Sequence, residues 1–237
     1  LSYGVTLSRN STGPSPIFPT YGSDFSIGLK ATLPYSLYNN KDYSVPSSLT
    51  IAEQRERIAD NLKWLEYYKI TAKGRWFTSF TNKLVLMTNA EFGYLGFYNE
   101  EVGQTPFERF FVGGDGIAQF QRDGRENIGL RGYPNNQLSP QEGGTIYNKF
   151  QLEMRYSITN APAASVYALS FIEAGNSYNN FKEFNPFVLK RSAGAGIRIF
   201  MPAFGLLGID YGYGFDNIPG QQGPSGWQPH FIIGRQF

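Results

Sequence analysis

The feature of this sequence that most constrains its fold is an alternation of apolar and polar residues with a period of two. In the segment 25–33 every second residue is apolar, with serine, glycine, lysine or threonine between them. The segments 146–158 and 206–216 repeat the pattern. Because successive side chains of a β-strand point to opposite faces, the pattern predicts strands with one apolar face. We expect that face to carry Phe25, Ile27, Leu29, Phe150, Leu152, Met154, Ile209, Tyr211 and Tyr213.

Nine segments carry this alternation, and the connections between them are by turns short and long. The predicted strands are 2–10, 25–33, 67–79, 84–97, 146–158, 165–178, 188–201, 206–216 and 227–237. Tight turns are expected at 81–83, 160–164 and 202–205, and long loops at 38–66, 99–145 and 217–226. Outer-membrane barrels have short turns on the periplasmic rim and longer loops outside. The sequence therefore predicts an all-β fold, an antiparallel transmembrane β-barrel whose apolar face contacts lipid.

Composition agrees with this prediction and excludes several kinds of function. The mean hydropathy of −0.34 is that of a soluble protein, but barrel strands that alternate lipid-facing and lumen-facing residues average to such values. A net charge of +2 is too small to indicate a nucleic-acid partner. The chain has no cysteine and a single histidine, His230, so no thiol chemistry and no histidine-cluster metal site can be built. We expect no enzyme activity and no cofactor, and we expect His230 at a lumen or rim position.

The number of strands bears on the size of the barrel. Bacterial single-chain barrels use an even number of strands, and an unpaired strand edge in lipid is costly. Nine strands do not fit a complete barrel. We therefore expect residues 1–237 to be the C-terminal portion of a larger transmembrane β-barrel, unable to close normally by itself.

The loop at 38–66 contains the one predicted helix, at 48–66. Ser47 and Ser48 are expected to cap it, and Glu53 and Arg57 form a favourable pair four residues apart. Its apolar residues share one face at helical spacing and are Ile51, Ile58, Leu62 and Leu65. We expect this extracellular insert to pack over the mouth of the barrel.

The longest loop, 99–145, contains Arg131 near its far end. A loop of this length seldom lacks structure, and an arginine inside a barrel needs a carboxylate partner. Glu153 lies on the polar face of the next strand and can accept two hydrogen bonds from the guanidinium. We expect the loop to enter the lumen and the pair to be partly screened by water, contributing about 1.5–3 kcal/mol.

Two passages of this loop carry a resemblance to a known family. The run Phe107-Glu108-Arg109-Phe110-Phe111-Val112-Gly113-Gly114, followed by Leu130-Arg131-Gly132-Tyr133, resembles the sixth extracellular loop of BamA and its relatives. These are the POTRA-bearing outer-membrane insertases and transporters, whose loop-tip motif is (V/I/L)-R-G-(F/Y). The resemblance implies that Arg131 docks against acidic residues on the barrel wall.

The same resemblance assigns the acids. It implies Glu153, in Leu152-Glu153-Met154, and Glu173, in Phe171-Ile172-Glu173-Ala174-Gly175, where glutamate stands in place of the usual aspartate. Strand alternation places Glu173 on the same face as Leu169 and Phe171, so parity does not establish that it points inward.

The end of the chain extends the resemblance, together with Ser192-Ala193-Gly194 and Met201-Pro202. The final strand resembles the β-signal by which outer-membrane proteins are recognised, and its signal or edge residues are Phe231, Ile233, Gly234 and Phe237. The resemblance implies that the chain starts at about the eighth of sixteen family strands. The first seven strands and the POTRA domains are then absent.

The resemblance implies a function in the outer membrane of a bacterium. The chain would belong to the central barrel subunit of the machinery that folds and inserts β-barrel proteins. Its expected partners are the lipid bilayer, incoming barrel precursors, accessory lipoproteins or other subunits, and the missing strands and POTRA domains. Two alternatives stay open: a transport pore of the two-partner-secretion type, and a small stand-alone barrel acting as a receptor, adhesin or enzyme.

Overall fold

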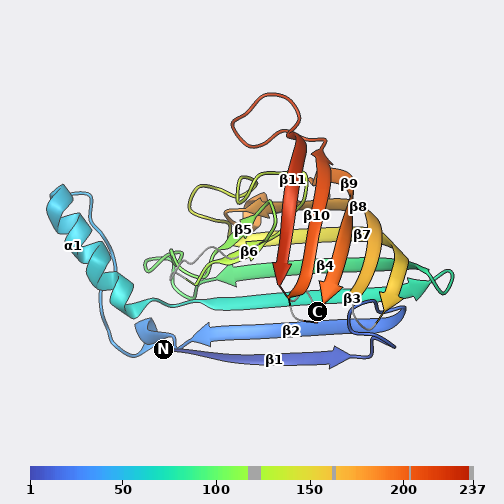
Figure 1. The fold of residues 1–237 in the computed structure, drawn as a ribbon. Helices are drawn as coiled ribbons and strands as arrows, with labels where there is room; N and C mark the ends of the chain where they lie inside the picture. Colours follow the sequence, from blue (N-terminus) through green and yellow to red (C-terminus); the bar gives the residue numbers. More distant parts are fainter. Residues whose placement is uncertain (117–123, 162–163, 203, 235–237) are drawn as a thin grey trace.

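Nine strands form one antiparallel sheet in the computed structural model, which describes residues 1–116, 124–161, 164–202 and 204–234 (Figure 1). The strand order follows the chain, so each strand of this sheet pairs with the sheet strands that precede and follow it along the sequence. They are β1 (Ser2–Asn10), β2 (Tyr21–Thr32), β3 (Tyr68–Ser79), β4 (Leu84–Gly96), β7 (Ile146–Ala161), β8 (Ala164–Tyr178), β9 (Lys190–Met201), β10 (Gly205–Gly214) and β11 (Gly226–Gly234). The predicted all-β, antiparallel fold is confirmed.

The sheet is a curved wall that does not close. β1 and β11 are at opposite ends of the strand order and are not paired with each other. In Figure 1, β1–β4 run along the bottom of the picture. The later strands, β8–β11, stand above them and all bend toward one side of the sheet. The curvature gives the sheet a convex and a concave face, and alternation along each strand divides the side chains between them.

The convex face carries the residues predicted to contact lipid. Ile27 is 59% exposed, Leu152 48% and Ile209 57%, although all three are large and apolar. Phe25 and Tyr213 on the same face are half-buried, because aromatic neighbours cover them. Phe25 packs edge-on against Trp76, with ring centroids 4.7 Å apart. A surface on which large apolar side chains are exposed together is expected to face lipid rather than water.

The concave face also has apolar residues, and these resolve the question of parity in β8. Leu169, Phe171 and Glu173 share the concave face and are buried, while Ile172 between them is 60% exposed on the other. A buried cluster on this side consists of Phe18, Phe77, Val85, Met87, Tyr167, Leu169 and Phe171. Glu173 therefore points inward together with Leu169 and Phe171, because the apolar face of this part of β8 is the inner one.

The helix in the loop after β2 is shorter than predicted. It is α1, Ile51–Asn61, and it begins at Thr50 rather than at Ser47 or Ser48. Thr50 accepts a hydrogen bond from the Glu53 backbone N–H, and the Glu53 carboxylate accepts one from the Thr50 backbone N–H. This capping box uses Glu53, so the predicted pair with Arg57 is absent and Arg57 binds Asp42 instead, at 2.7 Å.

The predicted packing of α1 over the barrel mouth is wrong. Figure 1 shows α1 extending away from the sheet, beyond the ends of its strands. Ile51 and Ile58 are exposed, and Asn61 is the one buried residue of the helix. Three short 3₁₀ turns complete the helical elements of the described residues: η1 (Tyr35–Leu37), η2 (Leu62–Trp64) and η3 (Phe181–Glu183). Within the described residues, no helix is long and apolar enough to cross a membrane.

Candidate functional site

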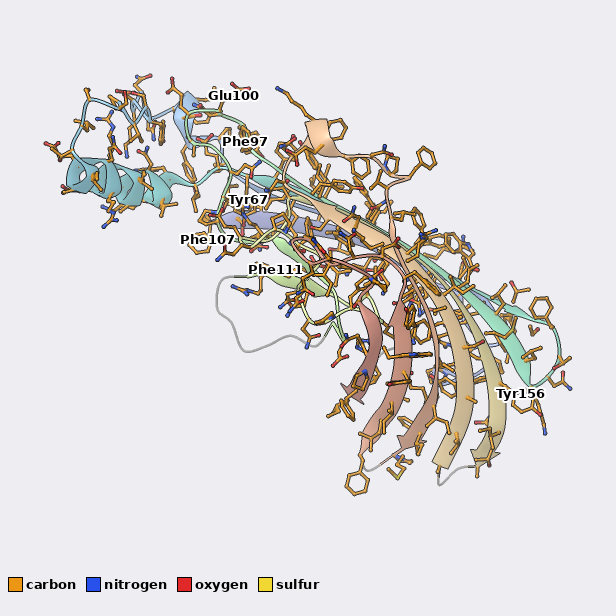
Figure 2. The ribbon with its side chains drawn as sticks, turned by 90° about the horizontal axis from the view of Figure 1, so that it is seen from above. Tyr67, Phe97, Glu100, Phe107, Phe111 and Tyr156 are labelled. Atoms are coloured by element: carbon orange, nitrogen blue, oxygen red, sulfur yellow. The ribbon has the colours of Figure 1, made fainter. Side chains whose placement is uncertain are left out.

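The described parts of the long loop between β4 and β7, residues 97–116 and 124–145, fold back on the concave side of the sheet. In Figure 2 the segment with Phe107 and Phe111 lies on that side. Two three-residue strands within it, β5 (Phe110–Val112) and β6 (Glu126–Ile128), pair in parallel. They place a buried core against the wall, made of Tyr67, Leu95, Phe110, Val112, Ile128, Leu130, Tyr133, Leu138, Tyr147 and Ile218. Strands this short carry no readable alternation, which is why the sequence did not predict them.

The loop tip, Leu130-Arg131-Gly132-Tyr133, inserts Arg131 into a set of three carboxylates on the wall. Nη2 of Arg131 donates to Glu153 Oε2 at 2.8 Å, and Nη1 donates to Asp210 Oδ2 at 2.8 Å. Glu173 accepts from three groups: Nε at 2.9 Å, Nη2 at 2.8 Å and the Arg131 backbone N–H at 2.7 Å. We call Glu153, Glu173 and Asp210 the acid set; they stand on β7, β8 and β10.

Further cations balance the acid set. Arg155 Nε donates to Glu153 at 2.8 Å, and Arg198 donates to both oxygens of Asp210, at 2.5 and 2.7 Å. The Arg131 guanidinium also lies over the ring of Phe171, 3.6 Å from its centroid. Three arginines thus face three carboxylates, so no buried charge in this group lacks an opposite one.

The acid set keeps Arg131 firmly charged. Burial alone would lower the pKa of Arg131, but the negative charges of Glu173, Glu153 and Asp210 outweigh it and raise that pKa. The expectation that water partly screens the Arg131–Glu153 pair is wrong. Arg131 is 6% exposed, and Glu153, Glu173 and Asp210 are less exposed still.

Sequence reasoning named two members of the acid set and missed the third. Asp210 lies on the polar face of the segment 206–216, so alternation alone indicated that it points inward. What the sequence did not reveal is the curvature that brings β10 as close to the loop tip as β7 is. The available signal was a carboxylate and an arginine at diagonal polar positions of neighbouring strands, Asp210 and Arg198.

Two glycines on β10, Gly212 and Gly214, leave room for the tip. The Gly132 φ is +85°, and a Cβ there would lie 2.9 Å from the Gly214 backbone N. A Cβ on Gly212 would in turn lie 2.9 Å from the Gly132 N, and one on Gly214 would lie 2.3 Å from the Gly132 O. The backbone of the tip therefore rests directly on the backbone of β10, which only glycines on both sides permit.

Tyr133 secures the tip against β9. Its hydroxyl donates to the Arg191 carbonyl at 2.6 Å, and its side chain is fully buried. Burial raises the pKa of Tyr133 to about 12, so the hydroxyl stays a donor throughout the physiological range. Leu130 packs on the other side of the tip, against Gly175 of β8. It fits there because Gly175 has no side chain; a Cβ at that position would lie 2.6 Å from Leu130 Cδ1.

A second charged contact of the loop, not predicted from the sequence, has the opposite polarity. Here two loop acids, Glu108 and Glu126, meet three lysines of β2 and β3: Lys30, Lys69 and Lys73, which we call the lysine set. Lys73 Nζ lies 2.9 Å from Glu126, and Lys69 Nζ donates to the Glu108 carbonyl at 2.9 Å. Glu108 has a φ of 64°, which is unusual for a residue other than glycine.

The last described strand, β11, carries the predicted edge residues. Phe231 and Ile233 are exposed on the convex face, and Gly234 pairs with Leu206 of β10. Phe237, the fourth predicted residue, lies outside the described residues. β11 pairs with β10 along one edge, and no described strand pairs with its other edge.

Comparison with known proteins gives one family and one fold. The Omp85 superfamily domain matches residues 1–237. Among solved structures, the chain is similar to a crystal structure of BamA from Haemophilus ducreyi lacking POTRA domains 1-3, with a TM-score of 0.62 and 17% sequence identity. The match covers 98% of this chain and 42% of that one, so the chain spans less than half of its length. No curated protein matched the sequence.

Proposed function

The chain belongs to the Omp85 superfamily of outer-membrane insertases and transporters, and on that premise we propose that it forms part of the barrel that inserts β-barrel precursors into the bacterial outer membrane. In this proposal the convex face contacts lipid and the long loop, 97–145, stands in the lumen. The chain performs no covalent chemistry. The partners that follow are incoming precursors, accessory lipoproteins, and the other strands and POTRA domains of the intact protein.

The observation that carries the proposal is the buried docking of Arg131 in the acid set. This loop is attached to the wall by two groups of ion pairs, one at Arg131 and one at the lysine set. Undocking the tip would break the ion pairs of Arg131 with Glu153, Glu173 and Asp210 at the same time. A loop fixed in this way braces the wall, which favours a function exercised at the strands and the lipid face.

The strand edge supplies the surface for that function. β11 has an edge that no described strand occupies, and backbone groups on such an edge can template an incoming strand. We infer that precursors pair along this edge. Gly234, with a φ of +112° and no Cβ contact within 4 Å, weakens the pairing at the end of the strand.

The test is an insertion assay with the intact protein in lipid vesicles. Folding of an added barrel precursor is followed by its heat-dependent shift in gel mobility, for the wild type and for Arg131→Ala. We expect the variant to lose most of the activity. Arg57→Ala is the matched control, since Arg57 is on helix α1, away from the loop tip, and makes an ion pair with Asp42. Equal activity of Arg131→Ala and the wild type contradicts the proposal.

One observation favours the alternative of a transport pore. Between the loop and the wall lies a cavity of about 370 Å³, lined in part by the charged side chains of Lys73, Arg75, Glu91 and Arg155. A polar cavity of this kind suits the passage of an extended polypeptide. Single-channel conductance and export of a secreted substrate, with no folding of added precursors, would favour transport over insertion.

A further inference from the structure

His230 is the one titratable group of β11 that lies buried beside the loop tip, and the proposed function does not use it. Its side chain is 3% exposed. Nε2 accepts a hydrogen bond from the Gly132 backbone N–H at 2.7 Å, and Nδ1 lies 2.6 Å from Asp115 Oδ1. Gly132 and Asp115 are both in the long loop, whereas His230 is in the strand that follows all the others.

These two contacts determine which nitrogen of the His230 imidazole carries the proton. A backbone N–H can only donate, so Nε2 must present its lone pair and carries no proton. A carboxylate can only accept, so Nδ1 carries the proton and donates to Asp115. The other nearby charge is that of Asp210, the cross-strand neighbour of His230, and two arginines already bind it.

The surrounding residues hold both partners in place. Asp115 lies between Gly114 and Gly116, which have φ of +74° and +69°, and its backbone N–H donates to the Asn135 side chain at 2.9 Å. Gly132 is fixed against β10 by the close backbone contacts of the loop tip. His230 therefore contacts two loop segments whose positions are set independently of β11.

We propose that His230 is a positioning residue that couples β11 to the loop tip, as a neutral imidazole with its proton on Nδ1. In the sheet, β11 has one described neighbour, β10. The His230 side chain links β11 directly to the loop through its hydrogen bonds with Gly132 and Asp115. Coupling between two sites is reciprocal, so undocking the tip loosens β11 and displacing β11 loosens the tip by the same factor. This inference holds whether the barrel inserts precursors or transports a substrate.

The protonation state is tested first on the intact wild type in lipid. Nitrogen NMR of imidazole-labelled protein, with the signal assigned by its absence in His230→Gln, should show Nδ1 protonated and Nε2 unprotonated. A merely space-filling histidine would not need that tautomer. A protonated Nε2 overturns the proposal, and this measurement requires no variant to fold normally apart from the assignment.

The coupling is tested by hydrogen exchange of the same protein. His230→Ala removes the acceptor for Gly132, and we expect exchange in 129–133 to rise on the order of tenfold, as for a lost buried hydrogen bond. Asp115→Ala, a change confined to the loop, should raise exchange in 226–234. His230→Gln, which keeps an acceptor near Gly132, should restore protection of the tip in part.

Gln228→Ala is the matched control. Gln228 stands on the same face of β11, two residues before His230, and its side chain donates to the Ser225 carbonyl at 3.3 Å. We expect this variant to leave exchange in 129–133 unchanged. If Asp115→Ala leaves β11 protected, or His230→Ala behaves as Gln228→Ala does, then His230 does not couple the two.

Discussion

At the scale of single residues, Arg131 contributes most to the docking of the loop. It is the one residue of the tip that touches β7, β8 and β10 through the same side chain. We expect Arg131→Ala to leave the three carboxylates with only Arg155 and Arg198 as arginine partners, an excess of one negative charge, and to cost about 3–5 kcal/mol in docking free energy. The strands should stay folded, and protease should cut within 125–140.

Arg131→Lys separates charge from geometry. Lysine restores one positive charge but not the planar set of donors that reaches three acids at once, so we expect partial protection. Limited proteolysis followed by mass spectrometry measures both variants. Full protection in Arg131→Ala would show that the apolar contacts of Leu130 and Tyr133 hold the tip without the arginine.

At Gly132 a side chain is excluded twice, by the positive φ and by the close contacts with the backbone of β10. We expect Gly132→Ala to displace the tip and to destabilise docking by about 1–3 kcal/mol. The control is Gly220→Ala, since Gly220 has a similar φ of +80° but no atom within 4 Å of its Cβ position. Proteolysis rates should rise for Gly132→Ala far more than for Gly220→Ala.

At the scale of elements, the long loop has a pH-sensitive contact with the lysine set. Burial alone would raise the pKa of Glu126, but the charges of Lys73 and Lys69 outweigh it and lower that pKa. The contact therefore adds stability above the ordinary glutamate pKa of 4.5. That stability is lost as the pH falls through the lower, folded value.

We expect hydrogen exchange at β6, corrected for the intrinsic pH dependence, to increase as the solution is acidified below about pH 4.5. Glu126→Gln should show the same exposure already at neutral pH and no further change on acidification. If wild-type β6 responds to acid no more than Glu126→Gln does, then another group is responsible for the effect.

The elements also show what could be predicted from the sequence. Period-two alternation predicted nine strands and the inward direction of Glu153, because both depend on neighbours along one strand. Asp210 and the lysine set were not predicted as contacts of the loop, because they depend on how far the wall curves. The start of α1 was misplaced because two serines before Thr50 are equally good caps in isolation, and only Thr50 has a glutamate three residues later that completes the reciprocal bonds.

At the scale of the whole molecule, the convex face should behave as a surface in contact with lipid. We expect Ile209→Arg to destabilise the folded barrel in vesicles by about 2–4 kcal/mol if the residue is near the bilayer midplane. Ile209→Val is the control, since it keeps the apolar surface. Urea unfolding of the intact protein in vesicles measures both, and equal midpoints would place this face out of contact with lipid.

The spacing of the tip contacts along the chain has a consequence for the order of folding. Arg131 binds Asp210, 79 residues later, and Gly132 binds His230, 98 residues later. Contacts between residues so distant in sequence form late, because the intervening chain must first be ordered. Because a polypeptide is made from its N-terminus onward, the loop exists before Asp210 and His230, the two residues that bind its tip. Full docking of the tip therefore signals that β11, with His230, has arrived.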